Sequence, residues 1–241
     1  MSVPLIDRLR LHYRRLRVKH SLHRNDALGA LHRAWGYVHA TQLAGDYYEF
    51  GVFRGASLVN SWLSFRYFRA HMETSRDLPF RREGSVLDFL AHEPSFYGFD
   101  TFAGMPKNNE GDDCLAADSF SASRALVEAR CRVVGLAAPR LKLVEGLFAD
   151  NRNAIGSRPA AVVYVDCDLY ASAVDALGII EPLLVQGTAL LFDDYNLFRA
   201  DRNRGERRAV AEFQQRTGIV LEPWFAYGTA SQAFLCHRYA E

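Results

Sequence analysis

The chain has 241 residues, of which 49% are hydrophobic and 24% charged, and its formal net charge is +1. This length suits one α/β domain with additions, and the apolar fraction excludes a largely disordered chain. The near-zero charge produces no whole-protein field that would attract nucleic acid or a membrane, so nucleic acid is an unlikely partner.

The four cysteines show no CxxC spacing, which argues against a zinc cluster and against a disulfide framework. They are Cys114, Cys131, Cys167 and Cys236. The N-terminus lacks the apolar core of a signal peptide, and no window approaches ~18 uncharged apolar residues. We therefore expect a cytoplasmic protein without a membrane segment.

Residues 1–44 are predicted to form a helical extension that precedes the main domain at residues 45–241. Apolar side chains recur at helical spacing in two stretches. They are Leu5, Leu9, Tyr13 and Leu16, then Leu28, Leu31, Trp35 and Val38. We expect the first stretch to pack on the main domain or on a second copy, which makes a homodimer a candidate.

The same extension is strongly basic. Residues 1–24 carry seven Lys and Arg residues against Asp7, a balance of 7 − 1 = +6. The alternative to packing is therefore that these arginines bind an acidic substrate or nucleic acid, although base-stacking aromatic residues are not interleaved with them.

Strand and helix patterns then alternate five times, which predicts an α/β fold with a Rossmann-like, doubly wound, mostly parallel sheet. Two final stretches around a glycine turn predict an antiparallel C-terminal hairpin, giving a seven-stranded sheet. The expected strands lie at 47–50, 95–100, 140–146, 160–166, 187–193, 219–225 and 231–238. Helices are expected over 121–131 and 206–217, and Ser172 with Asp175 predicts a capping box at the start of another.

Two segments are unusual for connections between such elements. Residues 69–94 are long enough to hold an extended helix and a loop. Residues 107–118 are polar and acidic and follow the second strand, a position that suits a lid.

The stretch DYYEFGVFRGASL at 46–58 combines a short strand, a strand-end acid, a glycine turn and a helix start. Such a turn suits a nucleotide-like cofactor, because ligands bind outside the carboxyl ends of parallel strands. Glu49, Gly51 and Gly55 do not fit the GxGxxG spacing, so NAD is the weaker alternative. Asp100 ends the second strand, where a carboxylate can accept hydrogen bonds from ribose hydroxyls.

Four aspartates end the fourth and fifth strands: Asp166, Asp168, Asp193 and Asp194. Neighbouring parallel strands would bring their carboxylates to one edge, where they repel one another unless protons or a cation hold them. Oxygen ligands of this kind predict a site for Mg²⁺ or a similar divalent cation. The alternative is that each aspartate caps the helix that follows it.

The order of seven segments resembles the macrocin O-methyltransferase family over about residues 46–217. The segments are YYEFGVFRGASL, YGFDTFAGMP, DSFSAS, EGLFAD, VDCDLYASAVDAL, LLFDDYN and GERRAVAEF. The resemblance implies an S-adenosylmethionine-dependent, divalent-metal-dependent O-methyltransferase that acts on a hydroxyl of a sugar or another small natural-product acceptor. The alternatives are an NAD-dependent enzyme, or a non-catalytic adaptor or nucleic-acid-binding module that uses the basic N-terminal helices.

The resemblance also implies roles for single residues. The residues implied to bind the cofactor are Glu49, Gly51, Gly55, Ser57, Asp100, Thr101, Phe102, Gly146, Phe148 and Asp166. Asp166, Asp193 and Asp194 are implied to bind the metal. We predict Asp168 as the catalytic base, with Asp166 as the second candidate, because Leu169 stands where catechol-type relatives have a lysine base.

Overall fold

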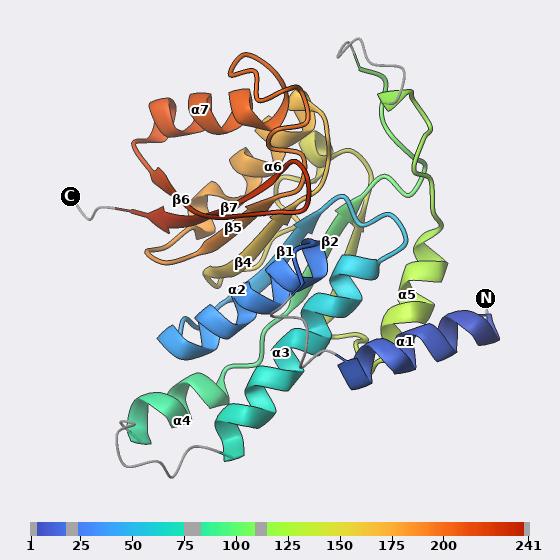
Figure 1. Ribbon diagram of the computed structural model, residues 1–241, viewed down its shortest axis with the longest axis vertical. Helices are drawn as coiled ribbons and strands as arrows, with labels where there is room; N and C mark the ends of the chain where they lie inside the picture. The colour runs from blue at the N-terminus through green and yellow to red at the C-terminus, as the bar shows by residue number, and fades with distance from the viewer. Residues whose placement is uncertain (1–3, 18–23, 75–82, 109–114, 239–241) are drawn as a thin grey trace.

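The computed structural model describes residues 4–17, 24–74, 83–108 and 115–238. A seven-stranded sheet in the order β3-β2-β1-β4-β5-β7-β6 forms its centre (Figure 1). The strands are β1 (Asp46–Phe50), β2 (Phe96–Asp100), β3 (Leu141–Glu145), β4 (Ala160–Val165), β5 (Ala189–Phe192), β6 (Val220–Tyr227) and β7 (Ser231–His237). The first five are parallel and β7 runs antiparallel to both β5 and β6. This confirms the predicted fold class, including the C-terminal hairpin.

Helices cover both faces of the sheet and create two cores. On one face lie α2 (Ala27–Thr41), α3 (Ala56–Thr74), α4 (Glu83–Ala91) and α5 (Arg124–Val133); on the other lie α6 (Tyr170–Ile180) and α7 (Gly205–Thr217). Successive strand side chains point to opposite faces, so Tyr47 enters the first core and Tyr48 the second. Because both faces are covered, every residue of β4 is buried, as its continuous apolar sequence predicts.

Two helix starts differ from the prediction. Helix α6 begins at Tyr170, two residues before Ser172, so the predicted capping box is wrong. The chain enters α6 directly from a tight turn at Asp168, which has a positive φ of 57°, and Asp175 pairs with Arg152 at 2.6 Å instead. Helix α5 begins three residues later than predicted, because Ser123 caps it by accepting from the Leu126 amide.

The first N-terminal helix, α1 (Leu5–Arg17), contacts the main domain at α5, but not through the apolar residues that were predicted to face it. The side chains of Leu5, Leu9 and Tyr13 are 72%, 61% and 56% exposed, whereas Leu11 is buried. The ion pair between Asp7 and Arg130 of α5 accounts for this orientation. Asp7 and Leu11 are four residues apart and therefore lie on the same face of α1, which is the face turned to α5. The side chain of Leu16 lies outside the described residues, and the homodimer stays a prediction.

The second N-terminal helix behaves as its pattern predicts. Leu31, Trp35 and Val38 of α2 are at most 1% exposed and belong to the same core as the sheet. Asp26 caps this helix by accepting from the Gly29 amide. The prediction for α2 is therefore confirmed.

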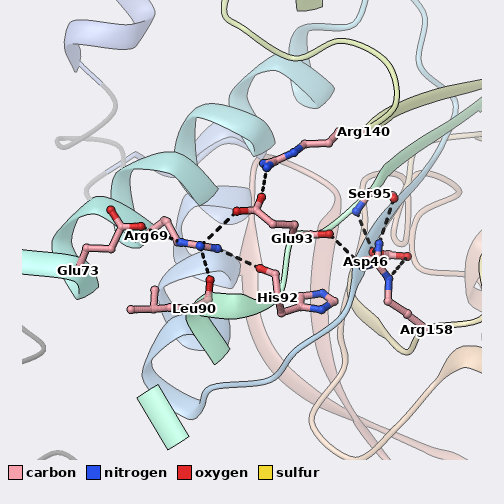
Figure 2. A network of polar contacts seen from close by, with 9 residues as sticks. All are labelled: Asp46, Arg69, Glu73, Leu90, His92, Glu93, Ser95, Arg140 and Arg158. Atoms are coloured by element: carbon pink, nitrogen blue, oxygen red, sulfur yellow. Dashed lines mark hydrogen bonds and ion pairs between the residues drawn. The ribbon is translucent and has the colours of Figure 1, made fainter. Parts of the chain in front are cut away.

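A polar network ties the amino ends of the strands to the helices around them (Figure 2). Asp46, 1% exposed, accepts from the Ser95 amide at 2.8 Å and pairs with Arg158 at 2.7 Å. Arg158 also donates to the Glu93 carbonyl, and Arg69 of α3 pairs with the Glu93 carboxylate at 3.2 Å. The network lies at the end of the sheet opposite the carboxyl ends, where the site was predicted.

The two long connections are described only in part. Helix α3 extends to residue 74 and α4 follows from residue 83, which confirms an extended helix, while residues 75–82 lie outside the description. Residues 109–114, which include Cys114, are also outside it, so the lid stays a prediction. Cys131, Cys167 and Cys236 are free thiols. Within the described ranges, none of the helices combines the length and apolarity needed to cross a bilayer.

Candidate active site

The loop after β1 brings two strand ends into close contact at Gly51. Its φ is +93°, and a Cβ atom there would lie 1.8 Å from the Asp166 carbonyl oxygen. The Asp166 amide also donates to the Phe50 carbonyl at 2.9 Å. Only glycine permits this backbone conformation together with so close an approach.

Asp100 holds the same loop from the neighbouring strand. One carboxylate oxygen accepts from the amides of Val52 and Phe53 at 2.7 and 2.8 Å, and the other accepts from the Phe102 amide at 2.7 Å. Phe53 and Phe102 adopt positive φ values of 47° and 53°. Backbone conformations of this kind persist only where the surroundings enforce them, and Asp100 provides that constraint here.

Glu49 lies beneath the loop, with a side chain that is 0% exposed. Its carboxyl oxygens accept from the Tyr47 hydroxyl at 2.5 Å and the Ser57 hydroxyl at 2.6 Å, and the Leu58 amide also bonds to it. Burial raises the pKa of Glu49 to about 8, against the lowering effect of Ser57 and Tyr47. Glu49 is connected to the surface of the loop through its hydrogen bond with the Ser57 hydroxyl.

The strand-end aspartates converge as predicted. Asp166, Asp193 and Asp194 each present an oxygen within 4.8 Å of the others. Burial raises the pKa of Asp194 to about 8, with the charges of Asp168 and Asp193 adding to the effect. Burial and then the neighbouring Asp193 likewise raise the pKa of Asp166. Asp168 lies within hydrogen-bonding distance of Asp194.

The donor set of this cluster fits a hard divalent cation. Three carboxylates from two adjacent strands supply the oxygen ligands that Mg²⁺ prefers, and their mutual repulsion is what a bound cation would relieve. Ser231 donates its hydroxyl to Asp193 at 3.3 Å, which orients that carboxylate.

A fifth acid, Glu206, stands behind the aspartates and was not predicted from the sequence. It is 0% exposed; one oxygen accepts from the Asp194 amide at 3.1 Å, and the other has no partner among the described residues. Burial raises its pKa, with Asp194 the next cause. The segment GERRAVAEF, part of the family resemblance, was the signal that could have identified Glu206.

A pocket of about 370 Å³ joins the glycine loop to the aspartates. The predicted residues that line it are Gly51, Asp100, Thr101, Phe148, Asp166, Asp168, Asp193 and Asp194. Sequence reasoning missed several of its lining residues, namely Phe53, Gly104, Met105, Pro106, Phe120, Leu147, Cys167 and Ser172. All eight lie in segments that carry the family resemblance.

A second pocket, of about 310 Å³, lies between α1 and the glycine loop and shares Phe53 and Asp166 with the first. Gly55 and Ser57 line this second pocket. Glu49, Phe102 and Gly146 line neither pocket.

Comparisons with known proteins agree with this geometry. The family model of the macrocin-O-methyltransferases (TylF) matches residues 85–224, more than half of the chain. The 8-demethyl-8-(2,3-dimethoxy-alpha-L-rhamnosyl)-tetracenomycin-C 4'-O-methyltransferase of Streptomyces olivaceus is 27% identical over 195 residues, which are 75% of this chain and 62% of that protein. The chain thus spans less than two thirds of the length of this relative.

Two solved structures share the fold. The O-methyltransferase NovP is 21% identical with a TM-score of 0.66, over 86% of this chain and 78% of that one. The calicheamicin methyltransferase CalS11 is 19% identical with a TM-score of 0.56, over 86% and 77% of the two chains.

Proposed function

Because the chain belongs to the macrocin-O-methyltransferase family, we propose that it transfers a methyl group from S-adenosylmethionine to a hydroxyl of a sugar-bearing small molecule. The observation that carries the proposal is one pocket that joins a glycine loop and the Asp100 carboxylate to four converging aspartates. The curated relative, named as a 4'-O-methyltransferase of a dimethoxyrhamnosyl compound, supports a sugar acceptor.

The cofactor part of the pocket follows from the carboxyl ends of β1, β2 and β3. In this proposal Gly51 lines the cofactor part of the pocket, Asp100 and Thr101 face the cofactor ribose, and Phe148 packs on its adenine. The bound donor supplies a sulfonium methyl group, whose carbon–sulfur bond breaks as a carbon–oxygen bond forms. The protein contributes chiefly by holding the acceptor oxygen in line with that methyl group.

The acceptor part follows from β4 and β5. Asp166, Asp193 and Asp194 would hold Mg²⁺, which when bound supplies Lewis-acid stabilisation of the acceptor oxygen. Asp168 is the proposed base that takes the hydroxyl proton, with Asp166 as the second candidate. Leu169 is 1% exposed at the start of α6 and carries no group that accepts a proton.

The remaining parts enclose the reaction. Residues 45–241 form the proposed catalytic domain and residues 1–44 its extension. Closure of the segment 107–118 over the pocket would exclude water from the transferred methyl group. Phe120, which follows this segment, contacts Phe53 of the glycine loop at the pocket, with ring centroids 5.7 Å apart.

The substitution Asp193→Ala separates the two halves of the proposed site. It removes one metal ligand while leaving the glycine loop intact, so we expect affinity for S-adenosylmethionine to change less than about threefold and affinity for Mg²⁺ or Mn²⁺ to fall at least about tenfold. Calorimetry measures both affinities, and methyl transfer in the presence of the metal should be lost with the second.

Asp88→Ala is the matched control, because Asp88 is exposed on α4 and lines neither pocket. It should bind donor and metal as the wild type does. Wild-type protein that binds no S-adenosylmethionine at millimolar concentration would contradict the proposed function.

A further inference from the structure

The second pocket is lined on one side by the N-terminal helix α1 and on the other by the glycine loop. Helix α1 lies beside α5 in Figure 1, and Leu11, 5% exposed, holds it against the domain. Asp7 pairs with Arg130 of α5 at 2.5 Å, and Arg130 donates to the Arg54 carbonyl of the glycine loop at 2.9 Å. Helix α1 is therefore fastened to the loop that lines both pockets.

The charge of this pocket is positive on the side of α1. Four arginines line it, against two acids. The arginines are Arg10, Arg14, Arg54 and Arg130, and the acids are Asp7 and Asp166, so the balance is 4 − 2 = +2. Asp7 is already engaged by Arg130 at 2.5 Å and by Arg10 at 3.7 Å. The remaining positive charge of the arginines is thus available to bind an anionic ligand.

Among the described residues, the guanidinium groups of Arg14 and of the exposed Arg54 have no carboxylate partner, and Arg14 is the more buried of the two. Its guanidinium is half-buried, and within the described ranges no carboxylate is paired with it. Burial and the nearby charges of Arg130 and Arg24 lower its pKa. An anion in the pocket would relieve both effects.

The opposite wall of the pocket is the start of α3. Gly55, Ala56 and Ser57 line it, and the 19-residue α3 begins at Ala56. The amino end of a helix carries a partial positive charge, which adds to that of the arginines. The pocket therefore presents positive potential from both sides.

We propose that Arg14, assisted by Arg10, binds the carboxylate of the amino-acid part of the methyl donor. The inference rests on the proposed function, in which the donor ribose lies at Asp100 in the first pocket. The donor then extends along the glycine loop, and its amino-acid end reaches the second pocket past Phe53 and Asp166, which line both. Helix α1 accordingly recognises the cofactor and is not only a packing element.

The test compares S-adenosylmethionine with its decarboxylated analogue by calorimetry. Wild-type protein should bind the analogue about tenfold more weakly or worse, because charge-assisted hydrogen bonds are lost. Arg14→Ala should weaken binding of S-adenosylmethionine by about tenfold, leave binding of the analogue unchanged, and so remove the preference. Arg14→Lys, which keeps the charge, should restore part of it.

Two variants of the same helix serve as controls. Arg15→Ala alters an exposed arginine that does not line the pocket, and both affinities should stay as in the wild type. Leu11→Ala loosens α1 without changing its charge and so displaces Arg14, which should weaken binding of S-adenosylmethionine more than binding of the analogue. If Arg14→Ala weakens both ligands by the same factor, or if wild-type protein shows no preference, the inference is overturned while the proposed function stands. Binding of neither ligand would contradict the proposed function itself.

Discussion

The carboxyl group of Glu49 is enclosed at the end of β1, in contact with the hydroxyls of Tyr47 and Ser57. Its position as a strand-end acid is visible in the sequence, but its complete burial is not. Since Ser57 lines the second pocket and Glu49 does not, the effect of Glu49 on a ligand passes through Ser57. Its direct bond to the cofactor stays a prediction.

Glu49→Gln should remove a pH dependence of stability. The pKa of Glu49 is about 8 in the folded protein against an ordinary value of 4.5, so between these values the folded state keeps a proton that the unfolded state has lost. Stability therefore falls as pH rises from 4.5 to 8, by up to ~1.4 kcal/mol per pH unit from this group. Urea denaturation at several pH values measures this slope, which should be smaller in Glu49→Gln. Glu128→Gln, at a solvent-accessible site on α5, should keep it; equal slopes in both variants would contradict the assignment.

At the scale of elements, α2 shows how a helix of ordinary pattern can bury unusual groups. His32 and His39 are 0% and 4% exposed, although a histidine among apolar residues does not reveal its burial in the sequence. The Nδ1 atoms contact the Ser64 hydroxyl at 3.0 Å and the Trp35 carbonyl at 2.8 Å. Their Nε2 atoms have no partner in the described part of the chain.

The helix pair α2–α3 should consequently lose stability in acid. Burial lowers the pKa of His39 from 6.5 to about 4. Between these pH values His39 is therefore protonated in the unfolded state and neutral in the folded state. Stability falls as pH drops from 6.5 towards 4, by about 3 kcal/mol for this residue. His39→Phe should flatten this part of the stability profile, measured by denaturant unfolding, whereas His71→Gln at an exposed position should leave it intact. If the stability of His39→Phe fell with pH as steeply as that of the wild type, burial of His39 would not be the cause of the loss.

For helices α1 and α6, the sequence pattern within the helix itself gives a wrong prediction of its buried face or of its first residue. The apolar stripe of α1 predicts a buried face, yet the pairing of Asp7 with Arg130 turns Leu5 and Leu9 to the surface. The spacing of Ser172 and Asp175 predicts a cap, yet the turn at Asp168 starts α6 earlier. Both outcomes depend on contacts with residues distant in sequence or on a local backbone conformation that a spacing rule does not contain.

At the scale of the whole molecule, the two ends of the sheet differ: one carries the proposed site and the other carries a structural polar network. The carboxyl ends carry the loops and aspartates of the proposed site, while the amino ends carry the polar network of Figure 2, which joins β1 and β2 to α3. Asp46 is the buried centre of that network. Rigidity at one end supports the geometry of the other, because β1 connects Asp46 to the glycine loop.

Asp46→Ala should destabilise the protein by about 3 kcal/mol, since it leaves the buried Ser95 amide without its acceptor and Arg158 without its partner. For a chain of this size the melting temperature should fall by roughly 6–12 °C, as measured by calorimetry or circular dichroism. Asp46→Asn keeps an acceptor for the Ser95 amide and should lose less than half as much. Equal losses in the two variants would contradict the importance of that hydrogen bond.

The sequence by itself determined the sheet, the order of its elements, the hairpin and the strand-end acids Asp100, Asp166, Asp168, Asp193 and Asp194. These follow from local periodicity and from the rule that parallel strands end at one edge, so neither requires knowledge of distant contacts. Only the tertiary structure decided that Glu49 and Glu206 are buried, and that α1 places Arg10 and Arg14 in a pocket beside the glycine loop. Burial, pairing and pocket shape arise from residues far apart in the chain, and a pattern along the sequence does not encode which of them meet.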